Sequence, residues 1–339
     1  MEIETATIKL YNKPQHRLTA LWAISESGLG GMMHAFKIPF TGFFLGGFAI
    51  VIIILMAYYS DKPFKTITQA TLMVVIIKAT ASPHSPPMAY LAVFFQGICG
   101  AFCLAYIPWK KAGVILFGLL ALLESAVQKF LITTLIFGKS VWEALDVFFL
   151  SIVKDFSLNP AFSFSFWLIA IYTGIYCLWG ITLSWWTIHL TTTLKTKAQN
   201  LFAQPTFWEM KNEYLEVPKK GKRARKIAFT FFTLLFICGV FVFNGFGNKA
   251  VYVLLRTLAA LLLMYTIITP VSQWLFKKWT LQKALEEQQQ IDGLLQIIPE
   301  IKQHVFQSMQ LAKQQKKGLA VYKEFVVNLI ILSLFEPVK

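Results

Sequence analysis

The chain has 339 residues, of which 56% are apolar and 14% are charged, and it carries a formal net charge of +15. Soluble domains contain about 25% charged residues, so the composition excludes a soluble globular protein. The 31 Phe and 10 Trp exclude intrinsic disorder, and the presence of only four Cys excludes a secreted disulfide scaffold. We therefore predict an all-α, polytopic membrane protein.

Apolar segments long enough to cross a bilayer recur along the chain. A transmembrane helix requires about 20 mostly apolar residues because the hydrocarbon core is about 30 Å thick. The first span carries Glu26 and His34. The third is short and carries Gln69 and Lys78, and a re-entrant segment is its alternative. We predict about eight spans, at residues 18–36, 40–59, 66–80, 87–107, 112–137, 161–188, 227–246 and 250–276.

The basic residues predict that both ends of the chain lie in the cytoplasm. Short cytoplasmic loops are rich in Lys and Arg, and with the N-terminus inside, the inner segments hold 25 basic residues. The outer segments hold only Lys37, Lys139, Lys154 and Lys249. We attribute the positive charge to orientation in the plasma (inner) membrane, and nucleic acid is not an expected partner.

Five regions follow from this topology. Within the outer loop 138–160, residues 141–156 place apolar side chains at helical spacing and predict an interfacial helix on the outer surface. The regions are a cytoplasmic N-terminus (1–17), a six-helix membrane unit that is the candidate for solute binding (18–190), a basic cytoplasmic linker (191–226), a transmembrane helical hairpin (227–276) and a cytoplasmic amphipathic helical tail (277–339).

The tail carries one apolar stripe. Leu294, Ile298, Ile301 and Val305 recur every three or four residues, which is typical of one face of an amphipathic helix. This face is expected to pack on the membrane, on the tail itself or on a partner, and the four residues are the candidate partner-binding set. The last apolar run, 326–335, is too short to span a membrane.

Motifs for known enzyme chemistry are absent from the sequence. It contains no Walker A sequence, no His-Glu-x-x-His and no Gly-x-Ser-x-Gly. No cofactor is identified, and ATP hydrolysis by this chain is not expected. Cys99 and Cys103 share a helix face, but two thiols without further ligands fall short of a structural metal site, so we expect them to pack.

Polar side chains inside the six-helix unit are the main functional signal. An ionised group in a membrane costs several kcal/mol unless it is paired or hydrated, so such residues often mark a ligand or ion path. The alternative is interhelical pairing of carboxylates with lysines, without a ligand. Glu124 lies near mid-membrane and is expected to need a cationic partner or a proton. The candidate ligand-binding residues are Glu26, His34, Lys78, His84, Gln96, Glu124, Gln128 and Lys129.

Residues 18–190 also resemble a known family. The Ile38-Pro39-Phe40-Thr41-Gly42 break, the Gly46-Gly47 pair, the Ser82 to Pro87 segment and Gln96-Gly97 are similar to features of the substrate-binding S component of energy-coupling factor (ECF) transporters. The resemblance implies capture of a vitamin or metal ion from the outer side, with a membrane partner and two ATPase subunits driving uptake. The chain departs from this family in its Met1-Glu2-Ile3 start and in residues 191–339, which follow the six spans.

Three function classes remain open at this point. The first is a transport component that binds a small solute, either a vitamin-like molecule or a metal ion, and works with transporter subunits. The second is a membrane assembly or scaffold protein that holds a cytoplasmic partner through its tail. The third is a lipid-modifying enzyme in which Glu26, His34, His84 and Glu124 act as acid and base groups. Membrane lipid is an expected partner in all three.

Overall fold

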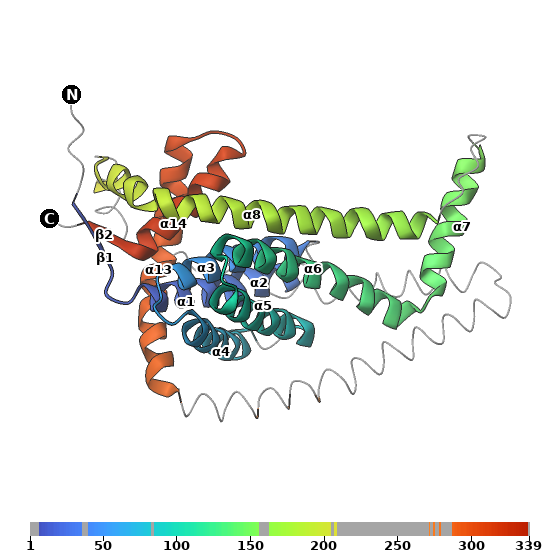
Figure 1. The fold of residues 1–339 in the computed structure, drawn as a ribbon, viewed down its shortest axis with the longest axis horizontal. Coiled ribbons are helices and arrows are strands. Elements are labelled where there is room, and N and C mark those ends of the chain that lie inside the picture. Colours follow the sequence, from blue (N-terminus) through green and yellow to red (C-terminus); the bar gives the residue numbers. More distant parts are fainter. Residues whose placement is uncertain are drawn as a thin grey trace, which may run out of the picture. The chain divides into compact units, whose positions relative to one another are not determined.

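The computed structural model describes residues 7–35, 40–82, 85–155, 163–204, 207–208, 271, 274, 278 and 287–337. These residues are almost entirely helical (Figure 1), and five of the helices are long and apolar enough to cross a membrane. The expected helical membrane architecture is confirmed at this level. The expected span 227–246, and 250–276 apart from Val271 and Trp274, lie outside the described residues.

The first apolar segment is a helix with a π-helical turn in its middle. α1 (Pro14–Ile24) begins at a proline, which suits a first helical turn because the nitrogen there needs no hydrogen-bond partner. The chain continues through the π-helical turn η1 (Ser25–Leu29) into α2 (Gly30–Ala35). Such turns are frequent at functional sites, and Glu26 lies in this one.

The five long apolar helices correspond to the next five expected spans. Residues 66–80 lie within one uninterrupted helix, α4. The fifth, α8, has 39 residues and at 1.5 Å per residue is about 58 Å long, nearly twice the thickness of a hydrocarbon core. α8 thus extends beyond the expected span 161–188 and includes residues 191–202, which were expected to belong to the linker. The five are α3 (Thr41–Tyr58), α4 (Pro63–Ala81), α5 (Pro87–Tyr106), α6 (Lys110–Phe137) and α8 (Phe164–Phe202).

The chain divides into two contact units. One contains residues 1–130, 166–212 and 269–339, and the other contains residues 131–165 and 213–268. In the second unit, α7 (Ser140–Asp155) forms where an amphipathic helix is expected. The following α8 is capped from α7: Asp146 Oδ1 accepts a hydrogen bond from Ser165 N at 2.6 Å, and this bond lowers the pKa of the Asp146 carboxyl.

Helices of the first unit approach each other most closely at glycines. A Cβ on Gly97 of α5 would overlap Thr71 of α4, and a Cβ on Gly118 of α6 would lie 2.6 Å from the carbonyl oxygen of Gly180 on α8. Small residues allow this kind of backbone approach in membranes, where dispersion contacts rather than the hydrophobic effect hold helices together.

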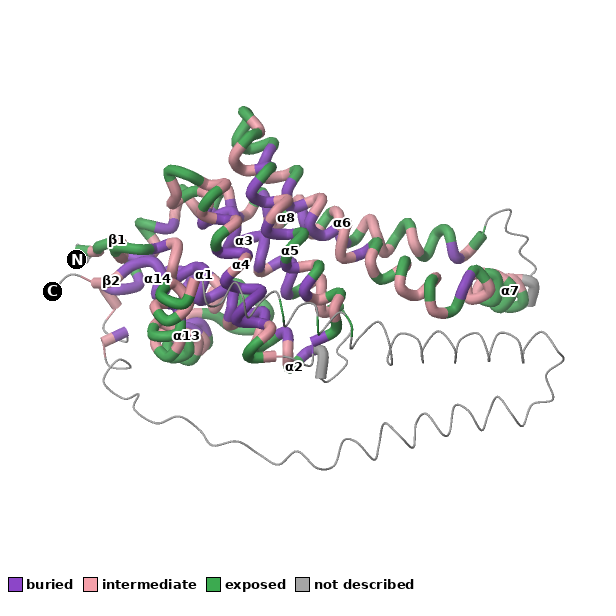
Figure 2. The backbone as a smooth tube through the Cα atoms, turned by 90° about the horizontal axis from the view of Figure 1, so that it is seen from below, coloured by how far each residue is buried: buried purple, intermediate pink, exposed green. Residues whose placement is uncertain are grey.

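The C-terminal tail packs against the start of the chain. α13 (Gln288–Gln315) contacts α1 and α14 (Ala320–Leu334), and β2 (Phe335–Pro337) pairs antiparallel with β1 (Ile8–Leu10). The apolar run 326–335, which is too short to span a membrane, lies mostly in α14, and the last eight residues of this helix are all buried. Figure 2 shows buried residues in α14, α1 and the adjoining helices.

Candidate functional site

Glu26 and Lys78 form a buried ion pair between the first helical segment and α4. Lys78 Nζ lies 2.7 Å from Glu26 Oε2, and the two side chains are 1% and 5% exposed, respectively. Lys78 Nζ also donates to the carbonyl oxygen of Ala89 on α5, at 3.2 Å. The charge of the lysine is therefore balanced locally. Interhelical pairing without a ligand was the alternative for the polar residues of this unit. For Glu26 and Lys78, the structure shows such a pairing.

A hydrogen-bonded group of neutral side chains surrounds this pair. The Tyr90 hydroxyl donates to the carbonyl oxygen of Ser82 at 3.0 Å, and the hydroxyls of Ser82 and Ser85 lie 3.0 Å apart. Lys78 Nζ lies 5.8 Å from the centre of the Tyr90 ring. The Ser82 to Pro87 segment is thus held to α4 and α5 at its described residues.

Gln96 lies where α3, α5 and α6 meet. Its side-chain amide nitrogen lies 3.0 Å from the position that a Cβ would take on Gly46 of α3, and Ser125 Oγ of α6 lies 3.6 Å from the same position. Gln96 is only 3% exposed, and its Oε1 has no hydrogen-bond partner among the described residues. A buried acceptor left in this state costs about 1–3 kcal/mol.

The second unsatisfied acceptor belongs to Glu124 on α6. Its Oε2 is buried without a hydrogen-bond partner in the described part of the chain. Glu124 was expected to need a cationic partner or a proton. Lys78 is not that partner, because it pairs with Glu26. One helical turn further on, Gln128 Nε2 donates to the carbonyl oxygen of Met88 at 3.1 Å. Because residues four apart share a helix face, Glu124 and Gln128 lie on the side of α6 that meets α5.

The remaining expected ligand-binding residues are Lys129, His34 and His84. Lys129 is exposed on α6. His34 belongs to the backbone of α2, but its side chain lies outside the description, as does all of His84. Among described residues, no group of three or more His, Cys, Asp and Glu side chains could hold a metal ion. Of the acid–base set considered for a lipid-modifying enzyme, the structure describes the side chains of Glu26 and Glu124 only, and Glu26 is paired with Lys78.

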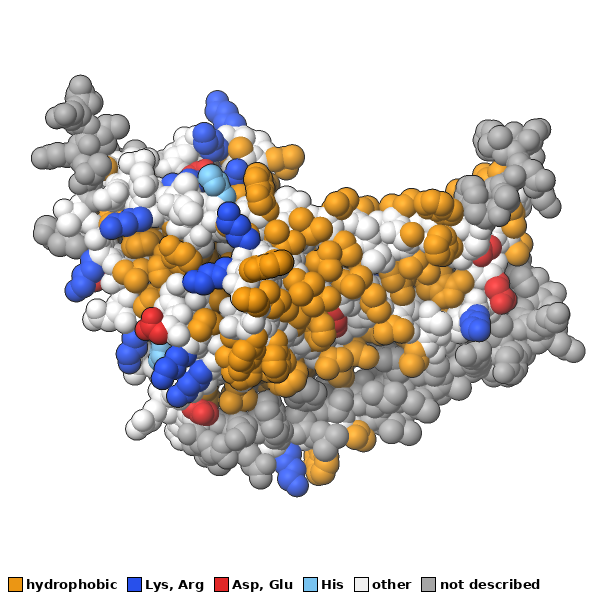
Figure 3. All heavy atoms as spheres, in the orientation of Figure 1, with side chains coloured by type: hydrophobic (Ala, Val, Ile, Leu, Met, Phe, Trp, Pro, Cys, Tyr) orange, Lys and Arg blue, Asp and Glu red, His pale blue; other side chains and the backbone are white. Residues whose placement is uncertain are grey.

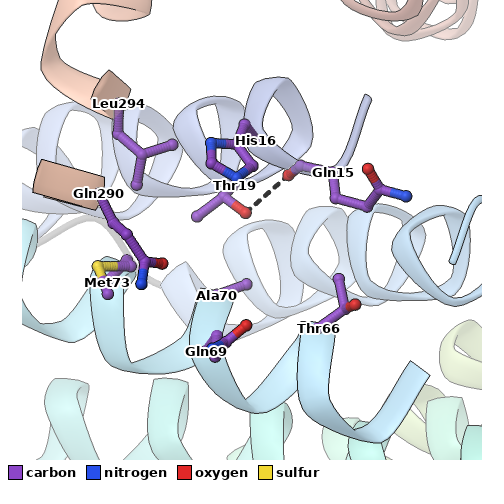
Figure 4. Close-up of a pocket in the computed structure, with 9 residues that line it drawn as sticks. All are labelled: Gln15, His16, Thr19, Thr66, Gln69, Ala70, Met73, Gln290 and Leu294. Carbon is purple, nitrogen blue, oxygen red and sulfur yellow. Dashed lines mark hydrogen bonds between the residues drawn. The ribbon is translucent and has the colours of Figure 1, made fainter. Parts of the chain in front are cut away.

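A polar cleft that the sequence did not predict lies between α1, α4 and α13 (Figure 4). Its volume is about 160 Å³. Several of its polar groups are already bonded within the chain: Thr19 Oγ1 donates to the Gln15 carbonyl oxygen at 2.7 Å, and the Thr66 hydroxyl lies 2.7 Å from that of Ser60. It offers less to a ligand than Gln96 and Glu124. It is lined by Gln15, His16, Thr19, Thr66, Gln69, Ala70, Met73, Gln290 and Leu294.

Two of the four candidate partner-binding residues are occupied inside the chain. Leu294 and Ile301 are 2% and 0% exposed and belong to the hydrophobic core. Ile298 and Val305 are half-buried on α13. The apolar stripe on the tail is therefore largely a packing face.

An unexpected polar clamp holds the tail in place. The Arg17 guanidinium donates to both carboxylate oxygens of Glu300, at 3.0 and 2.8 Å, and its Nε donates to the carbonyl oxygen of Ser333 at 2.8 Å. It also lies 3.7 Å from the centre of the Tyr11 ring. In the sequence, Arg17 is one of the inner basic residues that predict the orientation in the membrane, and Glu300 was not among the candidate residues. The only available signals were a basic residue one position before an expected span and a carboxylate on the helix that carries the apolar stripe.

Comparisons with protein-family models, curated proteins and solved structures find no match to this chain.

Proposed function

We propose that this protein is the solute-binding component of a plasma-membrane transporter. In this proposal residues 18–190 bind a small solute from the outer side of the membrane. The chain crosses the membrane eight times with both ends in the cytoplasm, and it works with a membrane partner and ATPase subunits, as the resemblance to ECF S components implies.

The observation that carries the proposal is the pair of unsatisfied acceptors, Gln96 Oε1 and Glu124 Oε2, on neighbouring helices of an apolar bundle. Glu26 and Lys78 satisfy each other, whereas these two oxygens do not have a partner within the described residues. Both are acceptors, so the solute that suits them contributes hydrogen-bond donors or a positive charge. A vitamin-like molecule with N–H or O–H groups and a metal ion both meet this requirement.

Contacts at the helix ends agree with the alternation of inner and outer segments in the proposed topology. At one end of the first unit, the Gln15 side chain donates to the Tyr59 carbonyl oxygen, and the rings of Phe64 and Tyr106 lie 5.4 Å apart. These residues lie in or next to segments assigned to the cytoplasm. At the other end of α4, Ser82 lies against Gly31, and both are assigned to the outer side. This grouping is what alternating spans require, whichever end faces the cytoplasm.

Native mass spectrometry of the detergent-extracted full-length protein tests solute binding. A small molecule or ion is expected to co-purify with the wild type and to be lost from Gln96→Leu and Glu124→Gln, while the melting temperature stays within a few degrees. Gln303→Leu is the matched control, because Gln303 is an exposed glutamine on α13 outside the site and outside the polar cleft, and it retains the ligand. Lower melting temperatures without loss of a ligand, or a wild type with nothing bound, contradict the proposal.

Affinity purification from the native membrane tests the coupling to partners. Recovery of ATPase subunits with the chain is expected. A stoichiometric complex without an ATPase would instead favour the scaffold function, for which half-buried Ile298 and Val305 on α13 are the available apolar contacts.

A further inference from the structure

The turn between α13 and α14 presents apolar side chains to solvent. We call residues 313–323 the hairpin tip. Gly318 has a positive φ of 64°, which favours glycine and allows the sharp reversal between the helices. Directly after it, Leu319 is 86% exposed, and Tyr322 is 63% exposed. These are among the most exposed large apolar side chains in the described structure, although the adjoining half of α14 is buried.

The hairpin tip is also strongly basic. It contains four exposed lysines and no acidic residue. None of these lysines forms an ion pair with another described residue. With Glu324 directly after the tip as the nearest acidic residue in the sequence, a net positive charge is left around two exposed apolar side chains. The lysines are Lys313, Lys316, Lys317 and Lys323.

Hydrogen bonds hold the base of the hairpin tip beside the end of α8. Gln315 Nε2 donates to Gln204 Oε1 at 3.0 Å, and Asn328 Nδ2 donates to Gln315 Oε1 at 3.1 Å. The tip is thus fixed to a helix that continues into the apolar part of the protein. Figure 3 shows the basic side chains gathered over the end where α13 and α14 lie, next to the broad apolar surface of the long helices.

We propose that the hairpin tip binds the anionic phospholipid surface of the adjoining leaflet. Lysines near a membrane are attracted to anionic headgroups by about 1 kcal/mol each, and leucine and tyrosine side chains suit the boundary between headgroups and acyl chains. The lysines contact lipid phosphates while Leu319 and Tyr322 enter the interface. The assignment of this leaflet to the cytoplasmic side rests on the orientation proposed above, but binding to anionic lipid does not.

Photo-crosslinking of the full-length protein in lipid nanodiscs tests this inference. Leu319 is replaced by benzoylphenylalanine, and nanodiscs are made of phosphatidylcholine alone or mixed with phosphatidylglycerol. Illumination is expected to give a lipid adduct, detected by intact mass, with several-fold higher yield when phosphatidylglycerol is present. At limiting anionic lipid, Lys316→Gln and Lys317→Gln each lower the yield about fivefold, which is the change that about 1 kcal/mol per lysine implies.

Two controls separate the hairpin tip from the rest of α13. Benzoylphenylalanine at Phe306, which is 54% exposed on the same helix, is expected to give little lipid adduct, and Lys302→Gln outside the tip leaves the Leu319 yield unchanged. Absence of an adduct at 319, equal yields in both lipid mixtures, or a protein adduct at 319 in native membranes would overturn the inference. None of these outcomes depends on solute binding, which native mass spectrometry reads separately.

Discussion

At the scale of single residues, the pairing of Lys78 with Glu26 leaves little freedom for either side chain. Taking both charges out of water is expensive, and their attraction offsets that cost only while both are present. The pair joins η1 to α4, and the additional bond to Ala89 O extends the link to α5. Its role in the described structure is to hold three helical segments in register.

Breaking this pair is expected to destabilise the protein severely. Glu26→Leu leaves the Lys78 ammonium buried without a counter-charge and should lower the free energy of unfolding in detergent by about 3–5 kcal/mol. The double variant Glu26→Leu/Lys78→Met removes both charges and should recover most of this loss. A double variant as unstable as the single one would show that the pair does not account for the effect.

The clamp around Glu300 makes stability depend on acidity. Hydrogen bonds from Arg17 are the main reason that the pKa of the Glu300 carboxyl lies below its ordinary value of 4.5. The folded state therefore favours the charged form, and the stabilisation is complete above pH 4.5 and lost as the pH falls through the lowered pKa.

The pH dependence can be measured by comparing Glu300→Gln with the wild type. At neutral pH the variant should be less stable by about 1 kcal/mol, because the partly exposed carboxylate is screened by solvent. The difference in melting temperature should shrink as the pH falls below about 4.5. A difference that is constant across this range would mean that the Glu300 charge contributes nothing.

At the scale of helices, the crossing of α6 and α8 depends on the absence of side chains. A Cβ on Gly180 would meet only backbone atoms and would overlap the carbonyl oxygen of Gly118. A Cβ on Gly118 would overlap Ser184 Oγ and lie 2.6 Å from the carbonyl oxygen of Gly180. Gly174 on α8 has nothing within 4 Å of its Cβ position and serves as an internal reference.

Alanine substitutions should distinguish these glycines. Gly118→Ala and Gly180→Ala are each expected to lower the free energy of unfolding by about 1–3 kcal/mol through overpacking. Gly174→Ala should be neutral or stabilising by about 0.5–1 kcal/mol, because alanine favours the helix. If thermal unfolding gives the same result at all three positions, α6 and α8 do not pack at this distance.

The apolar stripe on α13 allows packing to be separated from partner binding. Ile301→Asp puts a carboxylate into a fully buried position and should prevent stable folding, whereas Ile298→Asp, at a half-buried position, should leave the melting temperature nearly unchanged. Loss of co-purifying subunits from the folded Ile298→Asp variant would identify a partner contact. A severe loss of stability at both positions would assign the whole stripe to the core.

The helices were predictable from the sequence because apolar length and proline positions are local properties. The start of α5 at Pro87 matches the expected boundary, whereas α4 begins at Pro63, three residues before the expected segment 66–80. The stripe on the tail showed that α13 buries one face, but its periodicity contains no information about which segment covers it. The pairing of Arg17 with Glu300 was missed for the same reason, since 283 positions separate them.

At the scale of the whole molecule, the proposed orientation is open to a direct test. Ser85 is buried, so the cysteine is placed at the neighbouring exposed residue Pro86. It should react with an impermeant thiol reagent applied to intact cells, because the Ser82 to Pro87 segment is assigned to the outer side. Cysteines at Lys219 and Gln288 should be protected. Labelling at Gln288 in intact cells would reverse the orientation, and protection at all three positions would show that the segment around Ser85 is not accessible.

The contact between the two ends of the chain also sets an order for biosynthesis. Arg17 donates to the carbonyl oxygen of Ser333, which follows it by 316 positions. At about 5–20 residues per second, a ribosome needs roughly 15 seconds to a minute to synthesise that interval, and during this time α1 waits without its clamp. A chain that stops short of residue 333 has all the expected membrane spans yet cannot close β1 against β2. Closure of the tail therefore requires that residues 333–337 have been synthesised, and Arg17 stays unclamped until then.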